Sequence, residues 1–347
     1  MSRSAPIHPA AWWVWALGVA IAVTRTTNPL IHLLLVAATL AVVSIHGRMR
    51  DLRLYLVLGL LIVITRVGFR VFLGSDPTGD ILFSLPRIDL PGWMTGVSIG
   101  GPVSTESLLA ALFEGLRLGV MVIAFGAANA LTDVRRLLAL VPGALYEAGT
   151  ALVIGLTIAP RLVETTRRVA RAQELRGIAV RGPSRVSRIM VPVLVGSLDD
   201  SVTLAASMDA RGYGRVGAVD RKTRLQSASA LLSGVIGVLI GSYALLDTTS
   251  GLPGPALLLG GVILAGIGVR VGGRGVNRTQ YRVDVWNGTS LVITVIGVAV
   301  AVAVSIGAVI DVAGFHPSPG TWPELPILAA GAFITAIIPV ALRGVRS

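Results

Sequence analysis

Residues 290–310 read SLVITVIGVAVAVAVSIGAVI, an uncharged run made almost entirely of Val, Ile, Ala, Leu and Gly. A helix of this length, at 1.5 Å per residue, extends about 30 Å, which matches the hydrocarbon core of a bilayer. Backbone groups inside lipid must bond to one another, and a helix satisfies them within one segment. The run therefore predicts a transmembrane helix.

The same pattern recurs along the chain. Of its 347 residues 53% are hydrophobic and 14% are charged, whereas a soluble domain carries about 25% charged residues. The composition predicts an all-α, polytopic integral membrane protein with about eight transmembrane helices. The other predicted spans are Trp12–Val23, Pro29–Ile45, Leu54–Leu73, Thr105–Leu131, Leu225–Leu246, Pro253–Val269 and Leu325–Leu342. A further apolar run, Ala148–Ala159, would cover only about 18 Å and is too short to cross.

The distribution of positive charge sets the predicted orientation. With both termini in the cytoplasm and eight spans, the inner segments hold 25 of the 30 Lys and Arg residues, as the positive-inside rule requires. This distribution also explains the net charge of +12 without nucleic acid, which we exclude as a partner. The predicted organisation is 1–131 with about four spans, an inner segment 132–224, and 225–347 with about four spans. The outer loop 74–104 is either an ordered cap or flexible.

The inner segment is patterned as three helices. The first is Asp133–Leu140, with Thr132 as its N-cap; the second is Tyr146–Arg176, and the third is Ser187–Arg211. Both long helices end in Arg-Gly, and a glycine just past a helix end adopts the left-handed conformation that stops it. The two endings are Leu175-Arg176-Gly177 and Ala210-Arg211-Gly212.

Each arginine is therefore predicted to project from a helix tip. Leu204, Met208 and Arg211 share one face of the third helix, which gives an apolar stripe with a cation at its end. Such a tip could enter a groove with a carboxylate on another protein, or rest on anionic lipid headgroups. The repeated ending favours the protein groove. Around the two tips, the supporting residues of the predicted interface are Ala172, Gln173, Glu174, Leu204, Met208 and Asp209.

With these motifs, the chain resembles the T component of energy-coupling factor (ECF) transporters, which import vitamins, cobalt or nickel. That family carries two coupling helices that end in short x-Arg-x motifs, commonly Ala-Arg-Gly. Ala210-Arg211-Gly212 has the common form, and Leu175-Arg176-Gly177 has Leu in place of Ala. The resemblance covers roughly residues 15–245 and also includes Gly115-Leu116-Arg117 and Leu131-Thr132-Asp133.

The resemblance implies a subunit that transmits motion and performs no chemistry. Arg176 and Arg211 would dock into two cytoplasmic ABC ATPase subunits, and residues 132–224 would be the coupling domain. The apolar face at Ala148–Ala159 would move a small membrane subunit that binds a vitamin or a transition-metal ion. No G-x-x-x-x-G-K-[ST] motif occurs, so ATP hydrolysis is expected on separate subunits. We expect no catalytic residue, cofactor or metal site in this chain.

One feature departs from the family pattern, and two other functions remain as alternatives. The spans at 253–269, 290–310 and 325–342 exceed the usual family length, and are either an extension or part of a fused binding subunit. A self-contained secondary carrier and a polytopic membrane enzyme remain as other functions. For the enzyme, Asp199-Asp200 is the only adjacent acid pair.

Two further expectations concern packing inside the membrane. Arg117 lies within a predicted span and would pair with Glu114 or Glu106. The glycines in two neighbouring spans would allow close helix packing; they are Gly234, Gly237, Gly241, Gly260, Gly261 and Gly266.

Overall fold

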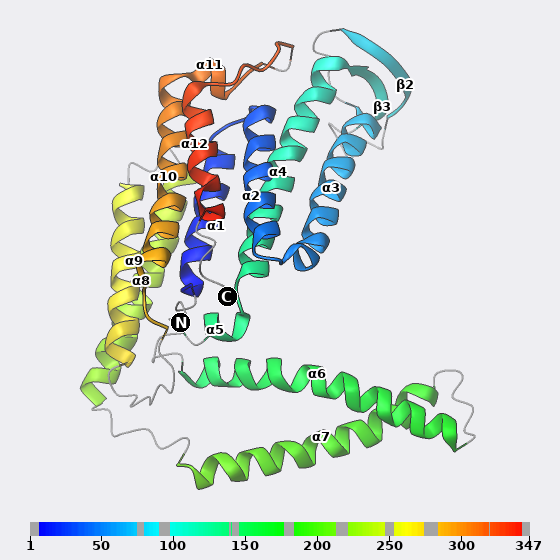
Figure 1. Cartoon of the computed structure of the whole chain (residues 1–347), viewed down its shortest axis with the longest axis vertical. Coiled ribbons are helices and arrows are strands. Elements are labelled where there is room, and N and C mark those ends of the chain that lie inside the picture. Colours follow the sequence, from blue (N-terminus) through cyan, green and yellow to red (C-terminus); the bar gives the residue numbers. More distant parts are fainter. Residues whose placement is uncertain are drawn as a thin grey trace. The chain divides into compact units, whose positions relative to one another are not determined.

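The computed structural model describes residues 7–74, 80–89, 98–138, 140, 146–176, 184–212, 221–246, 253–273, 284–318 and 320–341. Most of these residues are helical (Figure 1), which confirms the prediction of an all-α polytopic membrane protein. The chain forms two compact units, Met1–Leu137 with Val283–Ser347, and Leu138–Arg282.

The first unit contains eight of the described helices and a small sheet. Its helices are α1 (Pro9–Thr24), α2 (Pro29–Ile45), α3 (Met49–Phe72), α4 (Thr105–Leu131), α5 (Val134–Leu138), α10 (Gly288–Ile310), α11 (Val312–Phe315) and α12 (Ile327–Ile337), the last continued by a 3-10 turn, Ile338–Val340. The second unit contains α6 (Tyr146–Leu175), α7 (Ser184–Ala210), α8 (Arg221–Leu246) and α9 (Gly254–Gly272).

Length and composition divide the apolar helices into two groups. Among the described residues six helices are long and apolar enough to cross a membrane, namely α3, α4, α8, α9, α10 and residues 188–210 of α7. The first five coincide with predicted spans. The predicted spans at the two ends of the chain, α1, α2 and α12, form shorter apolar helices. Helix α7 was predicted to lie in the inner segment. Its length and composition alone, however, are those of a transmembrane span.

N-cap side chains and proline residues determine where the helices begin. Asn28 accepts a hydrogen bond from the backbone N–H of Leu30 at 2.9 Å, and Pro29 follows it at the first helical position, where the missing N–H costs nothing. At α5 the predicted cap was wrong. The Asp133 carboxylate, rather than Thr132, accepts the N–H of Arg135 at 2.9 Å, because a carboxylate is a stronger acceptor at a helix start.

The core of the first unit forms around α1. Helices α10, α4 and α2 pack on it, and α12 packs on α10 and α2. Trp15, Val19 and Val300 are fully buried in this core. Gly18 and Gly297 lie where α1 crosses α10: a Cβ added to Gly297 would approach the Trp15 Cα to 2.5 Å. The two backbones therefore meet closely because neither has a side chain there.

The three helices after the second unit are thus an integral part of the first. At the α1–α2 turn the Thr26 hydroxyl donates to the Phe315 carbonyl at 2.6 Å. The Asn28 amide donates to the carbonyls of Gly314 and Glu324, each at 2.7 Å. These bonds and the packing of α10 and α12 fix the described residues between 284 and 341 to α1 and α2.

The loop between α3 and α4 carries a small antiparallel sheet, so its described part is ordered. The strands are β1 (Leu73–Gly74), β2 (Ile81–Asp89) and β3 (Ser98–Ser104), in the order β1-β3-β2. Leu85 pairs with Gly101, and Ile88 pairs with Ile99 after a register shift.

In the second unit α8 and α9 form a closely packed pair. The prediction of glycine-mediated packing is confirmed for Gly234, Gly237, Gly241 and Gly261, whose added Cβ atoms would meet the other helix. It is wrong for Gly260 and Gly266, because no described atom lies within 4 Å of a Cβ at either position. Helices α6 and α7 pack on each other and run antiparallel (Figure 1).

Candidate functional site

The first predicted tip lies at the end of α6. This helix continues through Pro160, and its first half exposes apolar side chains such as Leu152, at 54%. At its end the Leu175 side chain is 89% exposed. Arg176 follows, also exposed, and its N–H bonds to the Ala172 carbonyl at 3.2 Å, as in a last helical turn. Gly177 lies outside the described residues.

The second predicted tip lies at the end of α7. Ala210 is the last helical residue, and Arg211 follows with an exposed side chain. Gly212 has φ of +74°, the left-handed conformation that glycine adopts without strain. Its N–H bonds back to the Asp209 carbonyl at 2.8 Å. The predicted glycine-terminated end with a projecting arginine is therefore present.

The structure separates the two arginines. The Gln173 side-chain amide donates to the Arg188 carbonyl at 3.3 Å, so the end of α6 lies beside the start of α7. Arg211 lies at the opposite end of α7. The helical rise places it roughly 35 Å further along. Arg176 and Arg211 are therefore far apart and do not belong to one site.

The supporting residues differ in accessibility. Ala172, Glu174 and Asp209 are exposed, and Met208 is half-buried. Leu204 is 36% exposed, so the stripe that leads to Arg211 remains accessible in this chain. Gln173 is half-buried and contacts α7. It therefore joins the two helices and is less accessible than its neighbours Ala172 and Glu174.

A basic hollow of about 480 Å³ lies beside the C-terminal half of α6. Its only described ion pair joins Arg168 to Glu164 at 3.6 Å, with both side chains about three-quarters exposed. An exposed pair of this kind contributes little to stability, so the arginines are available to a partner. The hollow is lined by Glu164, Arg167, Arg168, Arg171, Ala172 and Leu175.

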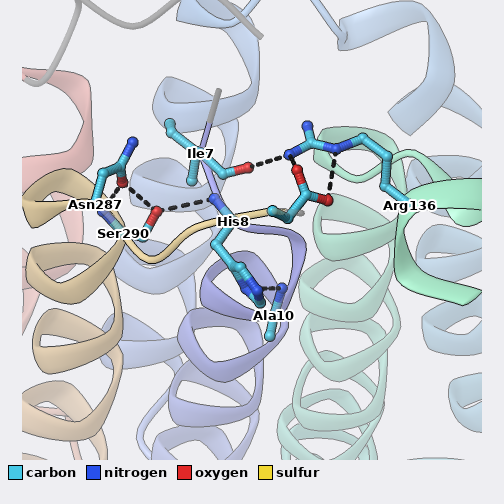
Figure 2. A network of polar contacts seen from close by, with 7 residues as sticks. Ile7, His8, Ala10, Arg136, Asn287 and Ser290 are labelled. Atoms are coloured by element: carbon cyan, nitrogen blue, oxygen red, sulfur yellow. Dashed lines mark hydrogen bonds and ion pairs between the residues drawn. The ribbon is translucent and has the colours of Figure 1, made fainter. Parts of the chain in front are cut away.

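A polar network in the first unit was missed by the sequence analysis (Figure 2). The Arg136 guanidinium donates two hydrogen bonds to Asp284, at 2.7 and 3.2 Å, and a third to the Ile7 carbonyl at 3.1 Å. One signal was available: Asp284 is the only acid in the basic segment 270–289. Its partner lies 148 positions earlier, a separation that no local pattern reveals.

The network continues onto the start of α1. The His8 N–H donates to the Ser290 hydroxyl at 2.9 Å, and its ring stacks on Trp286 with centroids 4.3 Å apart. Burial lowers the pKa of His8, Asp284 acts to raise it, and Arg136 acts to lower it. The His8 ring therefore favours its neutral form in this cluster.

Comparison with known proteins assigns the family. The model of the family described as cobalt transport protein, CbiQ, matches residues 4–223, which include both Arg-Gly endings. No curated protein matches the chain. The match ends in the first turn of α8, so most of α8 and all of α9 to α12 lie beyond it. With its apolar helices and more than half of its length matched, the chain is a membrane-embedded transport protein that belongs to the CbiQ family of cobalt transport proteins.

Proposed function

We propose that this chain is the transmembrane coupling subunit of an ECF-type ABC importer. Residues 1–131 and 225–347 would supply the membrane-spanning helices, and 132–224 the coupling domain. The observation that carries the proposal is the pair of exposed arginine tips, Arg176 at the end of α6, beside the start of α7, and Arg211 at the far end of α7. A spacing of roughly 35 Å suits one tip on each of two ATPase subunits.

Each tip would act by charge-assisted hydrogen bonding. A guanidinium at the end of an apolar stripe can enter a groove and bind a carboxylate with two parallel N–H···O bonds. At α7 the stripe is formed by Leu204 and Met208, and Gly212 ends the helix so that Arg211 projects. When ATP binding closes the two ATPases, the two tips would move with them, and α6 and α7 would move as levers.

The cargo would be a vitamin or a transition-metal ion. The family description names cobalt, which favours the metal ion. In the proposal a separate small membrane subunit binds this cargo. The apolar surface of α6, which includes exposed Leu152 and Leu156, would transmit the motion to that subunit by hydrophobic contact.

Charge reversal tests the proposal. The variants Arg176→Glu and Arg211→Glu place a carboxylate opposite the expected acid. Loss of one desolvated charged partner costs about 2–5 kcal/mol, a fall in affinity of about thirtyfold or more. We expect each variant to abolish uptake and the double variant to lose the copurifying ATPases. Pull-down from the native membrane, with nucleotide hydrolysis assayed on the eluate, measures both.

Arg161→Glu is the matched control. Arg161 is exposed on the same helix, α6, but lies four turns before its tip. It should keep uptake and copurification near the wild-type values. Full transport and full ATPase recovery by the doubly reversed variant would overturn the proposed function.

A further inference from the structure

The chain leaves the first unit and returns to it at neighbouring points. The second unit begins after Leu137, and the first resumes at Val283. Arg136 and Asp284, which lie beside these two crossings, form an ion pair with a shortest N···O distance of 2.7 Å. The two connections to the second unit therefore start from one place in the first.

The geometry and burial of the Arg136–Asp284 ion pair favour a strong interaction. The two N–H···O bonds come from Nε and Nη2, along one edge of the guanidinium, the bidentate geometry that gives the strongest charge-assisted contact. The Arg136 side chain is 30% exposed and that of Asp284 is 19%, so water screens the pair less than a surface ion pair. The third bond, to the Ile7 carbonyl, ties the same guanidinium to the segment that precedes α1.

The backbone on the Asp284 side is also fixed. Two residues after Asp284, Trp286 stacks on His8, and Asn287 caps α10 by accepting the Ser290 N–H at 2.9 Å. The Ser290 hydroxyl in turn accepts the His8 N–H (Figure 2). Asp284 thus projects from a segment anchored to both α1 and α10, and Arg136 projects from α5.

We propose that Arg136 and Asp284 form a clasp that joins the two points at which the chain leaves and re-enters the first unit. In this role they are positioning residues for the coupling step, and the inference rests on the proposed function. If the second unit were attached through only one connection, it could rotate about that connection without moving the first unit. When the two connections are held together where they join the first unit, a displacement of Arg176 and Arg211 is transmitted to α1, α5 and α10. Asp284 lies beyond the residues that match the family, so the clasp gives the C-terminal segment a mechanical role.

The test uses the complete transporter in proteoliposomes. Asp284→Asn and Arg136→Gln each remove the ion pair; Asn matches Asp in size, and Gln keeps an unbranched polar side chain. We expect normal ATPase copurification and continued ATP hydrolysis, with cargo uptake per ATP reduced about fivefold or more. The exchanged variant, Arg136→Asp with Asp284→Arg, should recover a large part of the uptake per ATP. Arg135→Gln, which removes the exposed neighbouring arginine, is the control and should behave as wild type.

The outcomes separate the clasp from the proposed function. Unchanged uptake per ATP in Asp284→Asn, or ATPase loss in that variant, overturns the positioning role. If the wild type recruits no ATPase, the proposed function fails. In that case the melting midpoint of the purified chain still tests whether Arg136 and Asp284 stabilise the first unit as an ion pair. Both single variants should melt lower and the exchanged variant should recover, whereas strictly additive shifts would show that the two residues do not act as a pair.

Discussion

Arg117 lies near the middle of α4, and its partner could not be found by counting along that helix. The sequence suggested Glu114 or Glu106, but Glu114 bonds instead to Arg66 of α3. Arg117 donates to the Thr24 carbonyl at 2.5 Å. Pairs within a helix contribute only about 0.2–0.5 kcal/mol, whereas the last carbonyls of α1 need donors and attract a cation. Helix packing therefore decides the pairing, and one-dimensional spacing does not show it.

We expect His8 to make the stability of the first unit depend on pH. Its Nδ1 accepts the Ala10 N–H at 3.3 Å, so the neutral ring serves as the N-cap of α1, and protonation at Nδ1 removes that acceptor. The pKa of His8 lies below its ordinary 6.5 in the folded chain, so the unfolded chain binds the proton first as pH falls. Stability is unaffected well above 6.5 and decreases as pH falls through 6.5 toward the folded pKa.

The replacement His8→Asn separates this effect from other titrations. Asn keeps a side-chain acceptor at the N-cap but does not titrate. Between about pH 7.5 and about pH 5.5 we expect the melting midpoint of the wild type in detergent to fall more than that of His8→Asn. Equal falls in the two proteins would show that His8 does not carry the pH dependence.

At the scale of helices, the sequence located the ends well and the contacts poorly. The predicted helix 146–176 is α6 (Tyr146–Leu175), and the predicted 187–211 is α7 (Ser184–Ala210). Helix ends depend on caps, glycine and proline, which act within a few residues. The tip at Arg211 was predictable for the same reason. The contact of Gln173 with α7 was not, because it depends on how two helices cross.

Gly297 of α10 tests one such crossing. In Gly297→Ala the new Cβ would lie 2.5 Å from the Trp15 Cα, a backbone atom that cannot rotate away. Helices α1 and α10 must then separate, and overpacking of this kind costs about 1–3 kcal/mol. We expect a lower melting midpoint. Gly331→Ala in α12 is the matched control: no described atom lies within 4 Å of its added Cβ, so its midpoint should stay the same or rise slightly. A wild-type midpoint for Gly297→Ala would contradict the close crossing.

At the scale of the whole molecule, composition was sufficient for the class of protein but not for its connectivity. Apolar runs and the distribution of arginine predicted a polytopic helical membrane protein, because lipid imposes the same requirement on every span. They could not show that α10 and α12 return to pack on α1 and α2. That return depends on side chains such as Asn28 and Asp284, whose partners are far away in the sequence. The Arg136–Asp284 ion pair was unpredictable for the same reason.

The placement of α7 is the prediction that belongs to the whole molecule. Residues 188–210 are long and apolar enough to cross a membrane, yet a coupling helix must lie in the cytoplasm. The chain has no cysteine, so single-cysteine variants report positions directly. Ser201 of α7 and Ser233 of α8 are a matched pair: both are exposed in this chain, and each hydroxyl bonds to the carbonyl four residues earlier.

In inside-out vesicles a membrane-impermeant maleimide should label Ser201→Cys quickly and Ser233→Cys slowly. The thiolate is the reactive form, and forming it in hydrocarbon, away from water, is strongly unfavourable. A cysteine on a cytoplasmic helix ionises freely, and one on a lipid-facing span does not. Denaturation in SDS and urea should raise the labelling of Ser233→Cys toward that of Ser201→Cys, since no folded span then holds either thiol in hydrocarbon. Protection of Ser201→Cys to the level of Ser233→Cys would place α7 in the bilayer. Arg211 would then no longer lie on a cytoplasmic lever, and the coupling proposal would lose its second contact point.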